Sequence, residues 1–113
     1  MKRLYCFSLY FCVAADIDVL GWFAFSRLLL FVMIESMADA AVSGGMPRAQ
    51  AYRFAAQAVL GSAKMVLETG KHPAELKDMV CSPAGSTIEA IRVLDELGFR
   101  TAIFEAMKAC EEK

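Results

Sequence analysis

The stretch Lys71-His-Pro-Ala-Glu-Leu-Lys-Asp-Met-Val-Cys-Ser-Pro-Ala-Gly-Ser-Thr-Ile-Glu-Ala-Ile-Arg-Val-Leu-Asp-Glu-Leu-Gly98 decides the fold that we expect for this chain. It joins two predicted helices through a short loop, residues 81–85, in which no side chain is larger than a proline ring or a thiol. Ser86 and Glu89 have the S-x-x-E spacing of a capping box, in which the serine hydroxyl accepts a hydrogen bond from the Glu89 amide. The spacing therefore predicts a helix whose N-cap is Ser86.

An amphipathic pattern follows this helix start. Apolar residues recur at helical spacing and charged residues occupy the other side: Ile88, Ile91, Leu94 and Leu97 against Glu89, Arg92 and Glu96. Gly98 ends the helix at the usual C′ position. A helix N-terminus behind such a slim loop exposes amide hydrogens and the positive end of the helix dipole to a small anion. Helix chemistry alone favours an ordinary turn with hydroxyl caps, and an anion site is the alternative.

A longer motif runs through the same stretch: His72-Pro73-x-x-Leu76-Lys77-Asp78-x-Val80-Cys81-Ser82-Pro83-x-Gly85-x-Thr87-Ile88-x-Ala90. It resembles the signature of pyrroline-5-carboxylate reductases, the NAD(P)H enzymes of the last step of proline synthesis. The likeness extends from about Phe31 through residues 35–41, Gly45-Met46-Pro47 and residues 58–65 to the C-terminus. It therefore covers about the last three quarters of the chain.

The resemblance implies a reaction and a set of site residues. The family transfers a hydride from a reduced nicotinamide to the imine carbon of 1-pyrroline-5-carboxylate, which gives L-proline. Carried onto this chain, Ser82 supplies a hydroxyl to the substrate carboxylate and Gly85 keeps the backbone bare for close approach. The amides of Ser86 and Thr87 point at the carboxylate, and the Thr87 hydroxyl, as the catalytic group, lies near the ring nitrogen. The family usually has two glycines where this chain has Ala84-Gly85; if position 84 needs a positive φ, alanine there costs about 1 kcal/mol or more.

The family begins with a nucleotide-binding domain whose glycine-rich turn, G-x-G-x-x-G/A, holds the cofactor pyrophosphate. The 113 residues contain no such turn, since Gly21 stands alone and Gly44-Gly45 lies at a predicted helix end. We therefore expect residues 31–113 to be the C-terminal substrate-binding and dimerisation domain, which binds no cofactor and is inactive alone. NADPH or NADH would serve the full-length family. Residues 1–30 are expected to be a foreign leader, for example the product of a shifted reading frame.

The first 34 residues are strongly apolar. Lys2-Arg3 followed by an apolar run resembles a signal peptide with Val13-Ala14-Ala15 as a cleavage site. The second apolar run is short for a transmembrane helix and carries Arg27 near its middle, which is costly in a bilayer. A membrane-anchored or exported protein is thus the weaker alternative, and we expect a cytoplasmic protein without membrane contact.

Two long helices are predicted before the opening stretch. One covers residues 31–42 and ends at Ser43-Gly44-Gly45; the other begins with Pro47 at its first turn and runs to Thr69. The polar residues of the second helix form one narrow stripe: Gln50, Arg53, Gln57, Lys64 and Glu68. A helix that has polar residues along only one stripe is expected to expose that stripe to water and to bury its other sides. One short chain cannot cover all of those sides. We therefore expect an intertwined homodimer or a higher homo-oligomer.

The remaining pattern adds a short helix from Pro73 to about residue 80 and a last helix over residues 99–113. No strand pattern is seen, so the predicted fold is an all-α bundle of about five helices. His72 stands before a proline with no acid or nucleophile beside it in sequence, which favours a solvated or capping role. A net charge of −1 without a basic run argues against nucleic acid, and one histidine with four scattered cysteines argues against a metal site.

Two functions stay open at this point. The chain is either the substrate-binding and dimerisation domain of a pyrroline-5-carboxylate reductase, or a non-catalytic helical dimerisation or interaction module. The two share a fold and differ in whether the loop binds a carboxylate ligand.

Overall fold

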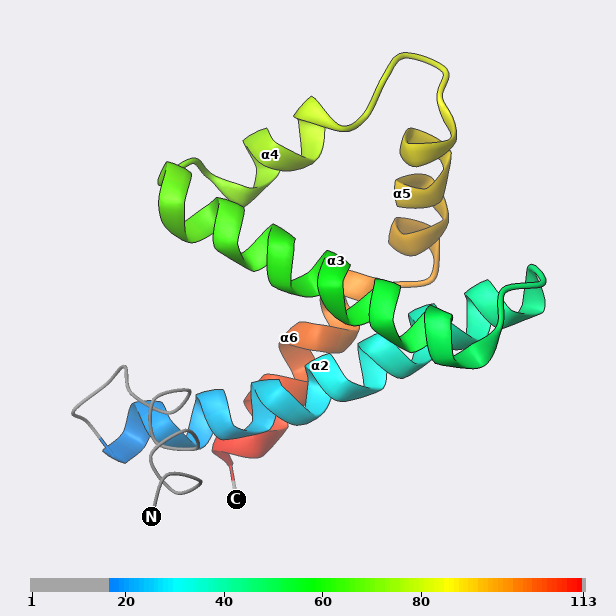
Figure 1. The fold of residues 1–113 in the computed structure, drawn as a ribbon. Coiled ribbons are helices and arrows are strands. Elements are labelled where there is room, and N and C mark those ends of the chain that lie inside the picture. The colour runs from blue at the N-terminus through cyan, green and yellow to red at the C-terminus, as the bar shows by residue number, and fades with distance from the viewer. Residues whose placement is uncertain (1–16, 113) are drawn as a thin grey trace.

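The computed structural model of the chain describes residues 17–112, with side chains from residue 25 onward. This part is helical throughout and contains no strand (Figure 1). The elements, in order, are α2 (Ile17–Ser43), α3 (Arg48–Thr69), α4 (Pro73–Met79), α5 (Ser86–Glu96) and α6 (Phe99–Glu111). The prediction of an all-α fold with about five helices is confirmed.

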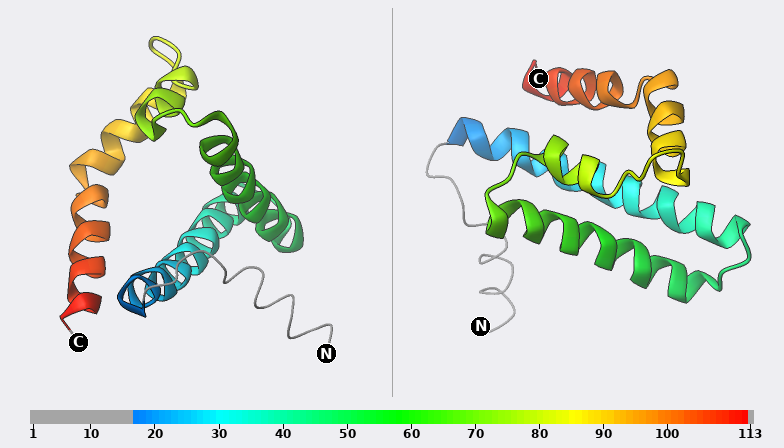
Figure 2. Two further views of the ribbon diagram at one scale, coloured as in Figure 1. Left: turned by 90° about the vertical axis from the view of Figure 1, so that its left-hand side faces the viewer. Right: turned by 90° about the horizontal axis from the view of Figure 1, so that it is seen from above.

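The two longest helices, α2 and α3, form an antiparallel hairpin (Figures 1 and 2). The chain reverses at Gly44-Gly45, where Gly45 has φ 100°, a value that favours glycine because it has no Cβ. Arg48 stabilises the connection between α2 and α3. Its Nη1 donates a hydrogen bond to Asp39 Oδ1 at 2.7 Å, and its guanidinium lies 5.9 Å from the centre of the Tyr52 ring. The hydrogen bond to Asp39 raises the pKa of Arg48 above its ordinary value.

The core of the hairpin is made of small residues. Ala38 of α2 and Ala51 and Ala55 of α3 are buried, and larger side chains border them: Ile34, Ala41, Val42 and Met46. Alanine pairs let the two helices approach closely, but they bury little apolar area. Among the described residues no large side chain is fully buried.

The second half of the chain forms an arch above this hairpin (Figure 2). The packed pairs of helices are α2 with α3, α2 with α6, and α5 with α6, so α4 belongs to none of them. After α3, the chain forms α4 and α5 above the hairpin. It then continues as α6, which packs against α2 (Figure 1). The turn before α5 lies at the top of the arch in Figure 1, away from the hairpin.

The helix bounds differ from prediction mainly at the first helix. It was expected to begin at Phe31, yet α2 begins at Ile17. Residues 17–30 carry no proline and only one glycine, so nothing in them stops a helix from continuing backwards. At α3 the shift is one residue, because Pro47 is the N-cap and Arg48 the first helical residue.

In the part of the chain that the structure describes, no helix has an apolar stretch long enough to cross a membrane. The signal-peptide reading of the first fifteen residues lies outside the described residues.

Candidate functional site

The loop before α5 is a tight turn. The Gly85 amide donates to the Ser82 carbonyl oxygen at 3.1 Å, which closes a four-residue turn with Pro83 and Ala84 in the middle. Ala84 has φ 56°, and it is the one residue other than glycine with a positive φ in the described range. Proline in the second position and a positive φ in the third are typical of a type II turn. Position 84 therefore does require a positive φ, and alanine there costs about 1 kcal/mol or more.

Glycine is needed at position 85 because a side chain would clash with Ser82, and not because of its backbone conformation. Its φ is −80°, which any residue can adopt, but a Cβ built on it would lie 2.4 Å from Ser82 Oγ and 3.2 Å from the Ser82 carbonyl oxygen. The bare backbone at Gly85 thus lets Ser82 fold tightly against the start of α5.

The predicted capping box is wrong. The N-cap of α5 is Gly85, with an extended ψ of 170°, and Ser86 is already the first helical residue. No side chain caps the helix, because an N-cap hydroxyl must come from a residue outside the helical conformation, and that position holds glycine. As a consequence, the amides of Ser86, Thr87 and Ile88 have no hydrogen-bond partner within the described residues.

The structure places the four predicted site residues on this turn and the first turn of α5. Ser82, Ser86 and Thr87 are exposed, and Gly85 is half-buried. Three free amides at a helix N-terminus, with hydroxyls on both sides, can accept a carboxylate, since amides and dipole both favour an anion there. No group of three or more histidine, cysteine or acidic side chains suited to a metal ion occurs in the part of the chain described.

His72 has the capping role that the sequence predicted. It is the N-cap of α4, and its Nδ1 accepts a hydrogen bond from the Ala74 amide at 3.1 Å. Pro73 follows as the first helical residue, where its missing N–H removes no bond. His72 is therefore assigned to the structure of the arch.

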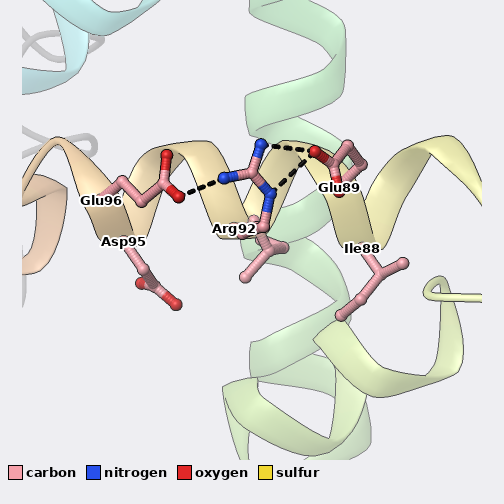
Figure 3. A pocket seen from close by; sticks show the side chains of 6 residues that line it. Ile88, Glu89, Arg92, Asp95 and Glu96 are labelled. Atoms are coloured by element: carbon pink, nitrogen blue, oxygen red, sulfur yellow. Dashed lines mark hydrogen bonds and ion pairs between the residues drawn. The ribbon is translucent and has the colours of Figure 1, made fainter.

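A hollow on α5 is a feature that the sequence analysis missed. Residues of α5 line it: Ile88, Glu89, Ile91, Arg92, Asp95 and Glu96 (Figure 3). Arg92 is held between two carboxylates, because Nε donates to Glu89 Oε1 at 2.7 Å and Nη1 donates to Glu96. The hydrogen bond to Glu89 raises the pKa of Arg92 above its ordinary value. The i, i+3 and i, i+4 spacing of these three residues could have predicted this arrangement.

Because both carboxylates already pair with Arg92, this hollow offers no unpaired cation to an anionic ligand. The candidate ligand site is therefore the turn and the free amides, while the hollow is an open surface of α5.

The fold and this candidate site define a class: an all-α domain in which α5 begins with amides that have no partner among the described residues. The sequence model of one family, described as pyrroline-5-carboxylate reductase dimerisation, matches residues 24–113. The chain therefore belongs to the pyrroline-5-carboxylate reductase dimerisation family. The match begins within α2, ahead of the predicted domain boundary at residue 31.

Curated relatives agree with this assignment. The chain is 70% identical to the pyrroline-5-carboxylate reductase of Escherichia coli (strain K12) over 95 residues, which are 84% of this chain and 35% of that protein. It is 56% identical to the pyrroline-5-carboxylate reductase of Methanosarcina acetivorans over 84 residues, 74% of this chain and 31% of the relative. The chain thus spans about a third of the length of these relatives.

Solved structures share the fold. The crystal structure of Plasmodium falciparum pyrroline carboxylate reductase with NADP bound matches with a TM-score of 0.80 at 28% identity, over 86% of this chain and 37% of that one. A pyrroline-5-carboxylate reductase from Coxiella burnetii matches with a TM-score of 0.78 at 29% identity, over 88% and 38% of the two chains.

Proposed function

We propose that this chain acts as the substrate-binding and dimerisation part of a pyrroline-5-carboxylate reductase. The observation that carries the proposal is the start of α5, where the amides of Ser86, Thr87 and Ile88 are free behind the turn closed by Ser82 and Gly85. In a chain of this family, such a helix start suits the carboxylate of 1-pyrroline-5-carboxylate. The reaction is the reduction of that imine to L-proline.

Each site residue has a proposed task. The amides of Ser86 and Thr87 hold the carboxylate, with the helix dipole favouring its charge, and the Ser82 hydroxyl donates a further hydrogen bond. The Thr87 hydroxyl bonds to the ring nitrogen, whose charge changes as the imine becomes an amine. The reduced nicotinamide, when bound in the assembled enzyme, supplies the hydride to the imine carbon.

The exposed apolar surface supports self-association. Seventeen large apolar side chains in the described part are at least 38% exposed, on all helices. At roughly 100 Å² of apolar area for each fully exposed side chain, with about half of it showing, they present on the order of 1,000 Å². A standard protein interface buries about 800 Å² per partner. We therefore propose a homodimer or a higher homo-oligomer, which light scattering on the purified chain would test: a well-folded monomer would contradict it.

We also propose that these 113 residues alone bind neither NADPH nor NADH with useful affinity and are inactive alone. Pyrophosphate binding uses a glycine-rich turn between a strand and a helix, and the sequence contains no G-x-G-x-x-G pattern. A fluorescence titration with NADPH that gave a micromolar Kd would overturn this proposal.

A second candidate function is a non-catalytic helical dimerisation module. Ala84 favours it, because the family usually has glycine at this position, and alanine at φ 56° can shift the turn on which the site would be built. Calorimetry with L-proline distinguishes the two candidates, since only an intact site gives a saturable signal.

A sharp test removes one amide from the site. Proline is tolerated at the first helical position, and the extended Gly85 before it suits a following proline. Ser86→Pro should therefore leave α5 folded while deleting one donor to the carboxylate. We expect a loss of about 1.5–3 kcal/mol, or roughly ten- to a hundredfold in affinity for L-proline.

Ser86→Ala is the matched control, because it removes the hydroxyl and keeps the amide. Equal affinity of wild type and Ser86→Pro, with helicity unchanged by circular dichroism, would remove the Ser86 amide from the proposed site.

A cytoplasmic location is part of the proposal. Cys81 and Cys110 are unpaired in the described part of the chain, as expected in a reducing compartment. Fractionation of cells that express the tagged chain would test it, and recovery in the membrane pellet would contradict it.

A further inference from the structure

We infer that this chain pairs with a full-length pyrroline-5-carboxylate reductase subunit through α3, and so forms mixed assemblies as readily as it pairs with itself. The inference rests on the proposed function, because it uses the same self-association surface. It adds a partner of stated kind: a longer subunit that carries a closely similar helical domain.

The surface consists of two apolar flanks on α3. Leu60 and Leu67, two turns apart, form one flank, and Phe54 and Met65, three turns apart, form the other. Between them runs the polar stripe identified in the sequence, on which Lys64 and Glu68 form an ion pair at 3.7 Å. We call the two apolar sets the Leu60 flank and the Phe54 flank.

Nothing in the described part of the chain covers these flanks. The face of α3 that carries Ala51 and Ala55 packs on α2, and neither α4 nor α5 forms a packed pair with α3. Leu67 is 84% exposed, Phe54 61% and Leu60 59%. Apolar area of this extent beside a narrow wet stripe marks a protein interface.

The identity of the partner follows from symmetry. A surface that joins two equal copies is self-complementary, so any chain that presents the same surface can take the place of one copy. The alignment with the Escherichia coli relative covers 95 of 113 residues, and every window of that length includes all of α3. At 70% identity, the relative therefore presents a surface close to that of this chain, and a few central residues decide such an interface.

The probe is the tagged Escherichia coli enzyme, co-expressed with the 113-residue chain and analysed by native mass spectrometry. With equal affinities and equal amounts of the two chains, statistical pairing predicts that about half of all dimer-level pairs are mixed. Recovery of the two proteins only in separate, unmixed assemblies would overturn the inference.

Two matched variants of the 113-residue chain locate the contact. Leu67→Glu places a charge on the Leu60 flank and should reduce the mixed fraction at least tenfold. Gln57→Glu adds the same charge on the polar stripe and should leave the mixed fraction unchanged. Because Leu67 makes little contact within its own chain, helicity measured by circular dichroism should survive its replacement. Phe54→Lys, on the other flank, repeats the test independently.

Light scattering on the 113-residue chain alone separates this inference from the proposed function. Self-association without mixing would contradict only the mixed pairing. A folded monomer that also fails to mix would contradict the proposed self-association itself.

Discussion

The α2–α3 hairpin and the arch of α4 and α5 differ in what holds them. The hairpin has its own core around Ala38 and Ala51 and an ion pair across its corner, from Arg48 to Asp39. The arch has no such core, since its apolar side chains, such as Ile88, are exposed. The ion pairs of Arg92 stay within α5, and the pair between Arg100 Nε and Asp95 Oδ1, at 3.0 Å, joins α5 to α6. The scaffold is therefore stabilised within the chain, whereas the part that carries the candidate site depends on whatever packs against it.

The largest effect should come from filling the hairpin core. Ala38 is completely buried between α2 and α3, so Ala38→Leu forces the two helices apart at their closest approach. Overpacking of this kind typically costs about 1–3 kcal/mol. Thermal unfolding followed by circular dichroism should show a clearly lower Tm.

Ala40→Leu is the control, because Ala40 is exposed on the same helix and has nearly the same helix propensity effect. Equal Tm values for the two variants would show that the hairpin does not carry the stability of the chain.

The next effect concerns the arch and its ligand. Thr87→Val keeps shape and branching but removes the hydroxyl proposed to bond to the ring nitrogen. Loss of one hydrogen bond typically costs about 0.5–1.5 kcal/mol, or about 1.5–3 kcal/mol when one partner is charged. Affinity for L-proline should therefore fall a few-fold to a hundredfold, measured by calorimetry, with little change in Tm.

If Thr87 served only as a helical residue, affinity would not change. Ser86→Ala sharpens the reading, because Ser86 does not cap α5 and its hydroxyl should contribute little to stability. Unchanged affinity in Thr87→Val, beside a measurable wild-type site, would remove Thr87 from the site.

The same contrast explains which features the sequence could predict. The helix end at Thr69 and the helix stop at Gly98 were predicted. Gly98 and Gly70, which follows Thr69, both have a positive φ, because a glycine after a helix acts through its own backbone. The single polar stripe of α3 predicted a helix that one chain cannot cover, and the exposed flanks of α3 agree. These are local properties or properties of one helix.

The features that were missed depend on competition between neighbours. Ser86 and Gly85 both suit an N-cap, and the Gly85 amide bonded to the Ser82 carbonyl decides for Gly85. That outcome frees the amides that a capping box would have partly used, so the site is more open than the pattern implied. The start of α2 was missed because the predicted bound followed the family resemblance, which begins at about Phe31, although Asp16 directly before Ile17 is a residue type that favours a helix start. The open arch follows from contacts between helices that no local pattern contains.

The smallest expected effect tests the strain in the turn. Ala84→Gly removes a Cβ from a residue with φ 56°, where the left-handed conformation costs alanine roughly 1–2 kcal/mol. Glycine loses more conformational freedom on folding, which offsets about 0.5–1 kcal/mol of that relief. The net gain should lie between zero and about 1.5 kcal/mol, visible as a small rise in Tm.

The affinity of Ala84→Gly for L-proline shows whether the strain at Ala84 helps or harms the candidate site. If the turn already holds the site in its binding geometry, Ala84→Gly should raise stability and leave the affinity for L-proline within twofold of wild type. If the strain pulls Ser82 and the α5 amides out of place, the same variant should bind L-proline several-fold more tightly, because the relaxed turn restores their alignment.

Gly70→Ala is the matched control for the backbone argument. Gly70 is another left-handed position, with φ 64° and no atom within 4 Å of the added Cβ, so this variant creates the strain that Ala84→Gly removes. Its Tm should fall by about as much as that of Ala84→Gly rises, while affinity stays constant. A fall in Tm for Ala84→Gly would mean that the Cβ of Ala84 contributes more to the arch than its backbone strain costs.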